Sequence, residues 1–362
     1  MSTSNTNRSM DPGHSGMAPS KPESGRLAIA MGDPAGIGAE VTLKALARWS
    51  PALPVVLVGC RRTLERCHDQ LHHSAPMADP RDYAIHDLPL REPCEPGRSD
   101  AAAGAASFRW LTAATELVLQ GSCGALVTAP IAKTSWHAAG HDYPGQTERL
   151  AELCQVERAS MLFTALAPDG RWRLNTLLVT THIPLAEVPL RLNASLVARQ
   201  LDVLLSFCNR FEPRPTLVVA GLNPHAGEGG ALGREESTWL EACLEDWRQR
   251  HPQVKLLGPL PPDSCWLSAA QAWQGTTIDA EGDSRGPDGY LALYHDQGLI
   301  PVKLLAFDAA VNTTLGLPFL RTSPDHGTAF DIAGLGVARP ESMAAAIETA
   351  LTLGLKPPIR PA

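Results

Sequence analysis

The sequence predicts an α/β protein built around a largely parallel sheet. Short apolar runs of strand length alternate with longer segments of helical spacing, which is the pattern of βαβ units. No internal repeat or low-complexity linker interrupts this alternation. The 362 residues are enough for two domains of ordinary size, or for one large domain with insertions.

The individual elements follow in order along the chain. Residues 1–25 are rich in Ser, Gly, Pro, Asn and Met without periodicity, so we expect a disordered tail and a fold that begins near Arg26. Apolar runs predict strands at residues 27–31, 55–58, 125–128, 161–166, 177–181, 217–220, 289–294 and 302–307. Helical spacing predicts helices at residues 39–48, 104–119, 147–153, 190–207, 235–250 and 340–353.

Composition and charge favour small-molecule chemistry. The formal net charge of −7 and the absence of Lys/Arg runs interleaved with aromatic residues argue against a nucleic-acid surface. The eight cysteines are scattered and form no CxxC pair, so neither a zinc ribbon nor a disulfide framework is indicated. Without a membrane-length apolar stretch or a signal-peptide pattern, we expect a cytoplasmic protein with no membrane partner.

Three histidines each stand shortly after a strand-like run. His182 follows residues 177–181, His225 follows the run that ends at Ala220, and His295 follows Tyr294. Because ligands of open α/β sheets bind outside the carboxyl ends of the strands, the three imidazoles are predicted to converge on one divalent metal ion. Such a site with open positions suits zinc, cobalt or, less well, magnesium.

Two glycine-rich loops follow predicted strands. The junction at residues 31–38 (MGDPAGIG) leaves backbone N–H groups at a helix N-terminus, where an anion is favoured, although a plain tight turn explains it equally well. Its spacing matches neither GxGxxG nor GxxxxGK[ST]. The loop at residues 221–230 (GLNPHAGEGG) carries His225, and its glycines allow close approach to an ion or substrate.

The segment from Tyr294 to Gly334 places charged residues among apolar ones. Buried charges need a partner or a ligand, since an unpaired one costs several kcal/mol. One interpretation is internal pairing, for example of Lys303 with Asp296. The interpretation we favour is an anionic substrate held by Lys303 and Arg321.

Several of these strings together resemble the 4-hydroxythreonine-4-phosphate dehydrogenase family of vitamin B6 biosynthesis. The similarity runs from about Leu27 to the last predicted helix. The strings that carry it are residues 32–38 (GDPAGIG), 181–185 (THIPL), 221–230, 258–261 (GPLP), 294–298 (YHDQG) and 312–328.

The resemblance implies a two-domain α/β/α fold like that of isopropylmalate dehydrogenase. We expect a discontinuous first domain formed by residues 26–140 and 295–362. Residues 141–294 then form a second α/β domain that carries the interface of a homodimer, with the active site shared between subunits.

The resemblance also implies roles for individual residues. His182, His225 and His295 match the metal ligands of the family. Thr147, Lys303, Asn312 and Arg321 match residues that contact the phosphorylated substrate. Gln146 stands where the family pattern has histidine, and its neutral amide can bind the substrate but cannot titrate near neutral pH.

A second similarity concerns the cofactor. Residues 326–334 (HGTAFDIAG) resemble the adenosine-binding loop of isopropylmalate and isocitrate dehydrogenases. This implies a dinucleotide contact by His326, Gly327 and Thr328. Asp331 would accept hydrogen bonds from the ribose hydroxyls, which suits NAD and disfavours the extra phosphate of NADP. A simple glycine turn next to His326 is the alternative.

The implied reaction is metal-dependent oxidation of 4-phosphohydroxy-L-threonine at C3 by NAD. The β-keto acid formed loses carbon dioxide to give 3-amino-2-oxopropyl phosphate, on the route to pyridoxal 5'-phosphate. A metal ion would lower the pKa of the C3 hydroxyl. Three residues are candidates for the base that removes the proton, namely Asp263, Asp296 and Lys303.

Other functions stay open at this point. Relatives on this scaffold oxidise four-carbon acid phosphates such as threonate or erythronate 4-phosphate, and Gln146 is compatible with such a change of substrate. A cis-dihydrodiol has no phosphate for Lys303, Asn312 and Arg321 to hold. A phosphate acyltransferase would not need the three histidines, and a metal-storage or regulatory protein would not need the adenosine-like loop.

Overall fold

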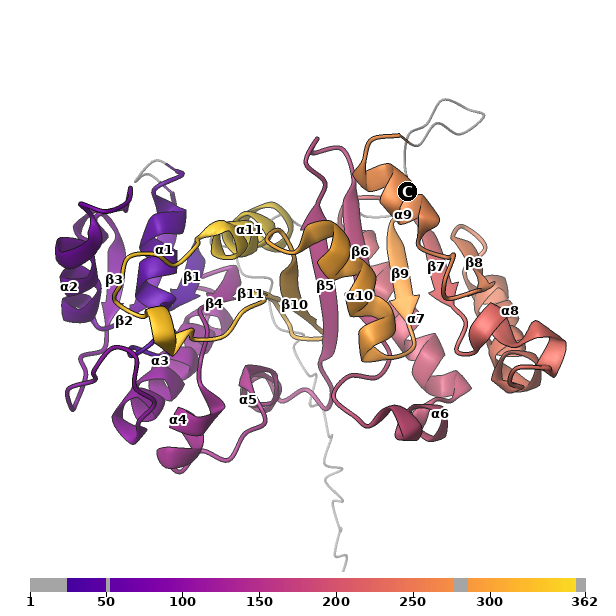
Figure 1. Cartoon of the computed structure of the whole chain (residues 1–362), viewed down its shortest axis with the longest axis horizontal. Coiled ribbons are helices and arrows are strands. Elements are labelled where there is room, and N and C mark those ends of the chain that lie inside the picture. The colour runs from indigo at the N-terminus through magenta and orange to yellow at the C-terminus, as the bar shows by residue number, and fades with distance from the viewer. Residues whose placement is uncertain (1–24, 50–52, 277–285, 356–362) are drawn as a thin grey trace, which may run out of the picture.

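The computed structural model describes residues 25–49, 53–276 and 286–355 (Figure 1). Eleven strands form one sheet in the order β3-β2-β1-β4-β11-β10-β5-β6-β9-β7-β8. Their bounds are β1 Leu27–Ala30, β2 Val55–Gly59, β3 Ala84–Asp87, β4 Ala125–Thr128, β5 Ser160–Leu166, β6 Arg173–Leu178, β7 Thr216–Ala220, β8 Lys255–Leu260, β9 Gly289–Ala292, β10 Val311–Leu315 and β11 Leu320–Pro324. The mixed α/β class and the mostly parallel sheet agree with the sequence prediction.

Strand direction changes only in the middle of the sheet. On one side β1, β2, β3, β4 and β11 pair in parallel, and on the other side β6, β9, β7 and β8 do the same. Between these sides β11 pairs antiparallel with β10, β10 with β5, and β5 with β6. The antiparallel strands therefore join two parallel α/β halves into one continuous sheet.

Helices cover both faces of the sheet and close its apolar cores (Figure 1). Around β1 and β2, α3 packs on one face while α1 and α11 share the core on the other. Around β6, β9 and β7, α7 and α8 cover one face and α9 and α10 the other. The helix bounds are α1 Gly38–Leu46, α2 Arg61–Leu71, α3 Ala101–Leu119, α4 Lys133–Ala138, α5 Gln146–Leu153, α6 Val188–Arg191, α7 Ala194–Cys208, α8 Glu241–Arg250, α9 Leu267–Trp273, α10 His295–Ala306 and α11 Glu341–Thr349.

One predicted strand is wrong. The apolar run at residues 302–307 was expected to be a strand, but it forms the end of α10, which continues through Pro301. Apolar runs of this length do not separate a buried strand from a buried helix segment. In α10 the apolar residues follow the helical period. Val302 and Ala306, four residues apart, are buried on one face, whereas Leu304 is 81% exposed.

The helix predicted at residues 190–207 is divided in two. α6 ends at Arg191, and α7 begins anew behind Asn193, whose side chain accepts a hydrogen bond from the Leu196 N–H at 2.9 Å. This is an N-cap, and it starts a helix where helical spacing alone showed no break. The tail predicted at residues 1–25 lies, apart from Gly25, outside the described residues.

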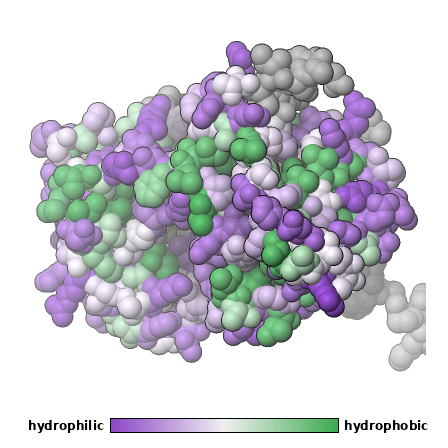
Figure 2. All heavy atoms as spheres, turned by 45° about the vertical axis from the view of Figure 1, so that its right-hand side comes forward, coloured by the Kyte–Doolittle hydropathy of each residue, from purple (hydrophilic) through white to green (hydrophobic). Residues whose placement is uncertain are grey.

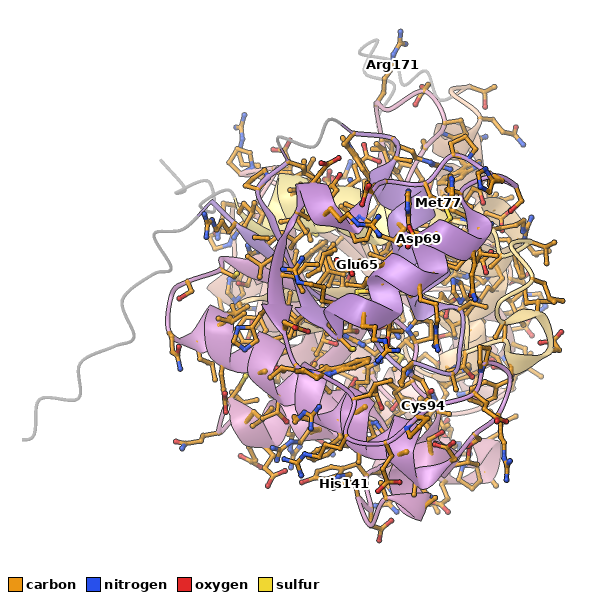
Figure 3. All side chains as sticks on the ribbon, turned by 90° about the vertical axis from the view of Figure 1, so that its left-hand side faces the viewer. Glu65, Asp69, Met77, Cys94, His141 and Arg171 are labelled. Carbon is orange, nitrogen blue, oxygen red and sulfur yellow. The ribbon has the colours of Figure 1, made fainter. Side chains whose placement is uncertain are left out.

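The surface is mixed in polarity. Figure 2 shows apolar side chains gathered in separate patches among polar ones, and Figure 3 shows α2 at one end of the molecule, with Glu65 and Asp69 labelled on it. Within the described ranges, no helix has the length and apolar character that crossing a bilayer requires.

Candidate active site

A cleft of about 470 Å³ opens where the two halves of the sheet meet. Residues from β4, β11, β10 and β5 line it, together with the start of α5 and the segment that follows β6. Alternation along antiparallel strands explains which side chains reach it: Arg321 and Ser323 share a face of β11, and Asn312 lies opposite Ser323 on β10. The polar residues of these strands therefore form one wall of the cleft.

Arg321 is a buried cation without a carboxylate partner. Its side chain is only 3% exposed and donates to the Thr128 hydroxyl (2.7 and 3.1 Å) and to the Thr314 hydroxyl (3.1 Å). Across the described part of the chain it forms no ion pair. Burial lowers the pKa of this guanidinium to about 10. The Glu148 carboxylate, which lines the same cleft, acts on it only through space and raises its pKa. A buried cation without an ion-pair contact on the wall of a cleft is a site for an anion.

The residues predicted to bind substrate gather around this cation. Gln146 and Thr147 open α5, and Asn312 lies half-buried on β10. The amide nitrogen of Gln146 donates to the Ala129 carbonyl at 3.2 Å, which leaves its buried Oε1 without a hydrogen-bond partner. Around Arg321 the cleft thus presents neutral polar groups, and its lining further includes the charged residues Lys133, Glu148 and Asp325.

Lys303 lies next to the cleft and pairs with a residue that the sequence-based site did not include. Its ammonium donates to the Asp325 carboxylate, and Asp325 lines the cleft. Burial lowers the pKa of Lys303. The pairing of Lys303 with Asp296 that the sequence left open is wrong, because the Asp296 carboxylate instead bonds Nδ1 of His295 at 2.7 Å.

The three histidines follow neighbouring strands at one edge of the sheet. His182 comes after β6, His295 after β9 and His225 after β7, in a loop where His225 has a left-handed φ of 51°. The rings of His182 and His295 lie 5.4 Å apart, centre to centre. Across the ranges that the structure describes, no three His, Cys, Asp or Glu side chains come together around a possible metal position. One chain therefore brings two of the three rings together.

The His182–His295 pair suits a divalent cation. Burial, and next the neighbouring His295, lower the pKa of His182, which favours the neutral ring that a metal ligand requires. The Asp296 carboxylate accepts a hydrogen bond from Nδ1 of His295, which fixes that ring and leaves the lone pair of its Nε2 available to a metal ion. Zinc and similar ions accept such imidazole donors.

A second cavity, of about 460 Å³, adjoins the cleft and shares Asp325 and His326 with it. It lies between α10 and the segment at residues 326–342, with apolar walls that include Phe307, Ile332 and Val337. Nδ1 of His326 lies 3.0 Å from the Gly327 carbonyl, and its buried Nε2 has no partner. The cavity can take a flat apolar group beside the cleft.

The remaining predicted cofactor residues lie on the same segment. Thr328 is buried, and its carbonyl accepts a hydrogen bond from the Ile37 N–H at 3.0 Å. Gly36 must be a glycine here, since a Cβ would lie 2.9 Å from Thr328 atoms. Gly327 lines the cleft, whereas Asp331 is exposed on the loop and outside both cavity walls.

Two candidate bases lie away from these cavities. Asp263 is exposed behind β8, and Asp296 is exposed at the start of α10, so neither lines the cleft or the second cavity. Lys303 lines the second cavity next to Asp325. Sequence reasoning missed the bridging position of Asp325, although the residue stands inside the string at residues 312–328.

Comparison with known proteins identifies the family. Residues 50–350 match the family described as pyridoxal phosphate biosynthetic protein PdxA. The chain belongs to this family. A 4-hydroxythreonine-4-phosphate dehydrogenase of Synechococcus sp. (strain RCC307) is 63% identical over 331 residues, which cover 91% of this chain and 99% of the relative.

Two further members of this group are similar over the same span. A D-threonate 4-phosphate dehydrogenase of Salmonella typhimurium is 41% identical, covering 91% of this chain and 99% of the relative. The crystal structure of a 4-hydroxythreonine-4-phosphate dehydrogenase from Klebsiella pneumoniae superposes with a TM-score of 0.74 at 39% identity, covering 91% of this chain and 99% of that one. The relatives thus include enzymes named for two different phosphorylated substrates.

Proposed function

We propose that this PdxA-family protein is a dehydrogenase that oxidises 4-phosphohydroxy-L-threonine at C3 with NAD, in the biosynthesis of pyridoxal 5'-phosphate. The β-keto acid product loses carbon dioxide to give 3-amino-2-oxopropyl phosphate. The observation that carries the proposal is the unpaired Arg321 cation on the cleft wall, next to Asn312 and Thr147. The names of the relatives support the same substrate class. We place the reaction in the cytoplasm.

Arg321 and its neighbours hold the substrate phosphate. The guanidinium supplies a planar set of N–H donors that matches a phosphate, and two threonine hydroxyls fix its orientation. Asn312 and Thr147 add neutral donors, and Gln146 contributes its unpartnered Oε1 as an acceptor. These residues orient the four-carbon chain so that C3 faces the second cavity.

The metal site takes His182 and His295 from one subunit and His225 from a second copy of the chain. The His182 and His295 rings lie close together, and within the described residues of one chain no third ligand joins them. Both observations support a homodimer with shared active sites. We propose that residues 141–294 form the dimerising domain and that residues 26–140 and 295–362 form the other, except that α10 packs with the first of these. Zinc, cobalt and magnesium are the candidate ions.

The second cavity receives the nicotinamide cofactor. Phe307, Ile332 and Val337 give it apolar walls, and His326 offers an unpartnered ring nitrogen. Asp331 lies exposed on the same loop, where its carboxylate accepts hydrogen bonds from ribose hydroxyls and repels a 2'-phosphate. This favours NAD over NADP.

Bound cation and cofactor would supply a lowered hydroxyl pKa and a hydride acceptor, respectively. We assign to Lys303 the removal of the proton from the C3 hydroxyl. Lys303 lines the second cavity and pairs with Asp325, which lines both cavities. Burial lowers the pKa of its ammonium, which favours loss of a proton from this group. Asp325 holds the ammonium in place, and Asp296 orients His295 rather than acting as a base.

The alternative substrate is D-threonate 4-phosphate, or the related erythronate ester. Gln146 is compatible with this alternative, since it presents a neutral acceptor where the family pattern has an ionisable ring. A threonate ester carries a C2 hydroxyl in place of the amino group, and either group can donate to Oε1. A cis-dihydrodiol lacks the phosphate that Arg321 requires, so we do not propose it.

The test is a direct assay of purified, metal-loaded protein with NAD. Both phosphorylated acids are supplied in parallel, and reduced cofactor and released carbon dioxide are followed together. We expect equal amounts of NADH and carbon dioxide from 4-phosphohydroxy-L-threonine, at a higher kcat/KM than for threonate 4-phosphate. The reverse order would establish the alternative, and no turnover of either ester would refute the assignment.

A further inference from the structure

A buried ion pair on α1 lies outside both cavities. Glu40 and Lys44 stand one turn apart on this helix, and their side chains are only 2% and 6% exposed. The ammonium of Lys44 makes three hydrogen bonds: to Glu40 Oε1 (2.7 Å), to the Gly336 carbonyl (2.8 Å) and to the Ala338 carbonyl (2.9 Å). All three of its N–H groups are therefore used.

The pair binds one distant segment of backbone through both of its members. Glu40 Oε1 also accepts a hydrogen bond from the Ala338 N–H at 2.8 Å. An anion and a cation together thus bind one N–H and two carbonyl groups of residues 336–338. An apolar pair could bind none of them, so the charges define where this backbone lies.

The other end of the same segment is held by the turn that precedes α1. The Ile37 N–H donates to the Thr328 carbonyl at 3.0 Å, and Gly36 packs directly against Thr328. Between these two attachments lie Asp331 and most of the apolar wall of the second cavity. We call residues 328–338 the cofactor loop.

The energetics favour a positional role over a stabilising one. Removing two charges from water costs several kcal/mol, and a packed apolar pair of similar volume often gives equal or greater stability. The Glu40–Lys44 pair recovers this cost only through its bonds to each other and to the cofactor loop. Its specific effect is the position of that loop.

We propose that Glu40 and Lys44 are positioning residues that hold the cofactor loop in its dinucleotide-binding conformation, so that they set the affinity for NAD and not the affinity for the phosphorylated substrate. This rests on the proposed function only in naming the dinucleotide as the ligand of the loop. Neither residue lines the cleft that contains Arg321.

The test compares Lys44→Met with wild-type protein and with a matched control, Arg61→Met. Arg61 likewise pairs with a glutamate four residues away, Glu65 on α2. The side chains of this pair are 42% and 29% exposed, in contrast to those of Glu40 and Lys44. NAD affinity is measured by calorimetry without substrate, and hydrogen exchange of residues 328–338 is measured without cofactor. KM for substrate and kcat are taken at saturating NAD.

For Lys44→Met we expect at least tenfold weaker NAD binding and faster exchange in the cofactor loop, with substrate KM and kcat within about twofold of wild type. The Arg61→Met control should match wild type in every measurement. A folded Lys44→Met protein with unchanged loop exchange and unchanged NAD affinity would overturn the proposal. An equal loss of substrate affinity would also overturn it, because that indicates general damage.

Two further outcomes are distinguishable. If Lys44→Met does not fold, Glu40→Gln serves instead: it keeps the Oε1 acceptor but removes the charge that balances Lys44, and we expect a smaller increase in loop exchange and a smaller loss of NAD affinity. Unchanged exchange and affinity in this variant would refute the positional role. If wild-type protein itself does not bind NAD, the proposed function fails, and the exchange measurement alone decides whether the pair positions the loop.

Discussion

Replacement of Arg321 by methionine is expected to weaken binding of the substrate phosphate while leaving the free energy of unfolding nearly unchanged. In the folded protein the guanidinium carries a charge that burial opposes: its pKa falls from 12.5 to about 10, which corresponds to about 3 kcal/mol. Against this stand three hydrogen bonds to the Thr128 and Thr314 hydroxyls, at about 1 kcal/mol each. Because these contributions nearly cancel, we expect the free energy of unfolding of Arg321→Met to stay within about 1 kcal/mol of wild type.

The effect on catalysis is expected to be large. Loss of two charge-assisted hydrogen bonds to a phosphate costs about 3 to 6 kcal/mol, or about 10²- to 10⁴-fold in kcat/KM. The assay measures NADH formation from 4-phosphohydroxy-L-threonine and from unphosphorylated 4-hydroxythreonine, with urea unfolding in parallel. In Arg321→Met, kcat/KM should fall for the phosphorylated substrate and stay unchanged for the unphosphorylated one.

A matched control is Arg210→Met. Arg210 is also an arginine whose pKa burial lowers, but it donates to the Leu353 carbonyl, and neither residue lines the cleft. Its loss should leave kcat/KM unchanged. The reasoning is refuted if a folded Arg321→Met keeps wild-type kcat/KM, or if its activity falls only in proportion to a lost fraction of folded protein.

Three further predictions concern other residues. Alanine at His182, His225 or His295 should abolish metal-dependent turnover, and mixing His182→Ala with His225→Ala subunits should restore part of it; full activity in all three single variants would contradict the shared metal site. Asp331→Asn should raise the ratio of kcat/KM for NADP to that for NAD, and an unchanged ratio would exclude this carboxylate from cofactor choice. Burial raises the pKa of the Asp33 carboxyl group, so the folded state binds this proton more tightly than the unfolded chain does, and stability is lost as pH rises above 3.8. Asp33→Asn should therefore raise the urea midpoint at pH 7 relative to wild type. The difference between the two midpoints should shrink towards pH 4.

Hydrophobic patterning predicts the apolar strands of the sheet and misses the two edge strands, β3 and β8, together with the two polar strands near its centre, β10 and β11. β1, β4 and β7 are short apolar runs and were predicted close to their observed bounds. β10 (VNTTL) and β11 (LRTSP) were not predicted, because their buried residues are largely polar. These strands form a wall of the cleft, where polar side chains face a ligand, so local patterning fails at the place where function requires polar groups.

The sequence predicted which residues belong to the candidate site but not how their side chains contact one another. Gln146, Thr147, Asn312 and Arg321 line one cleft, and their contact with a substrate stays a prediction. The contact of Lys303 with Asp325 joins residues 22 positions apart on different elements, and no spacing rule reveals such a pair. Spacing along the chain also gives no sign that, within the described residues of one chain, His225 stays apart from the other two rings.

The continuous hydrogen bonding from β4 through β11 and β10 to β5 restricts how the two halves can move. A hinge would need a connection that bends freely, whereas here the strand ladder itself crosses the boundary beneath the cleft. Large rotation of one half would break backbone bonds between strands. Closure over a bound molecule must therefore come from a change in sheet twist or from the short segments at the rim, such as the first turn of α5.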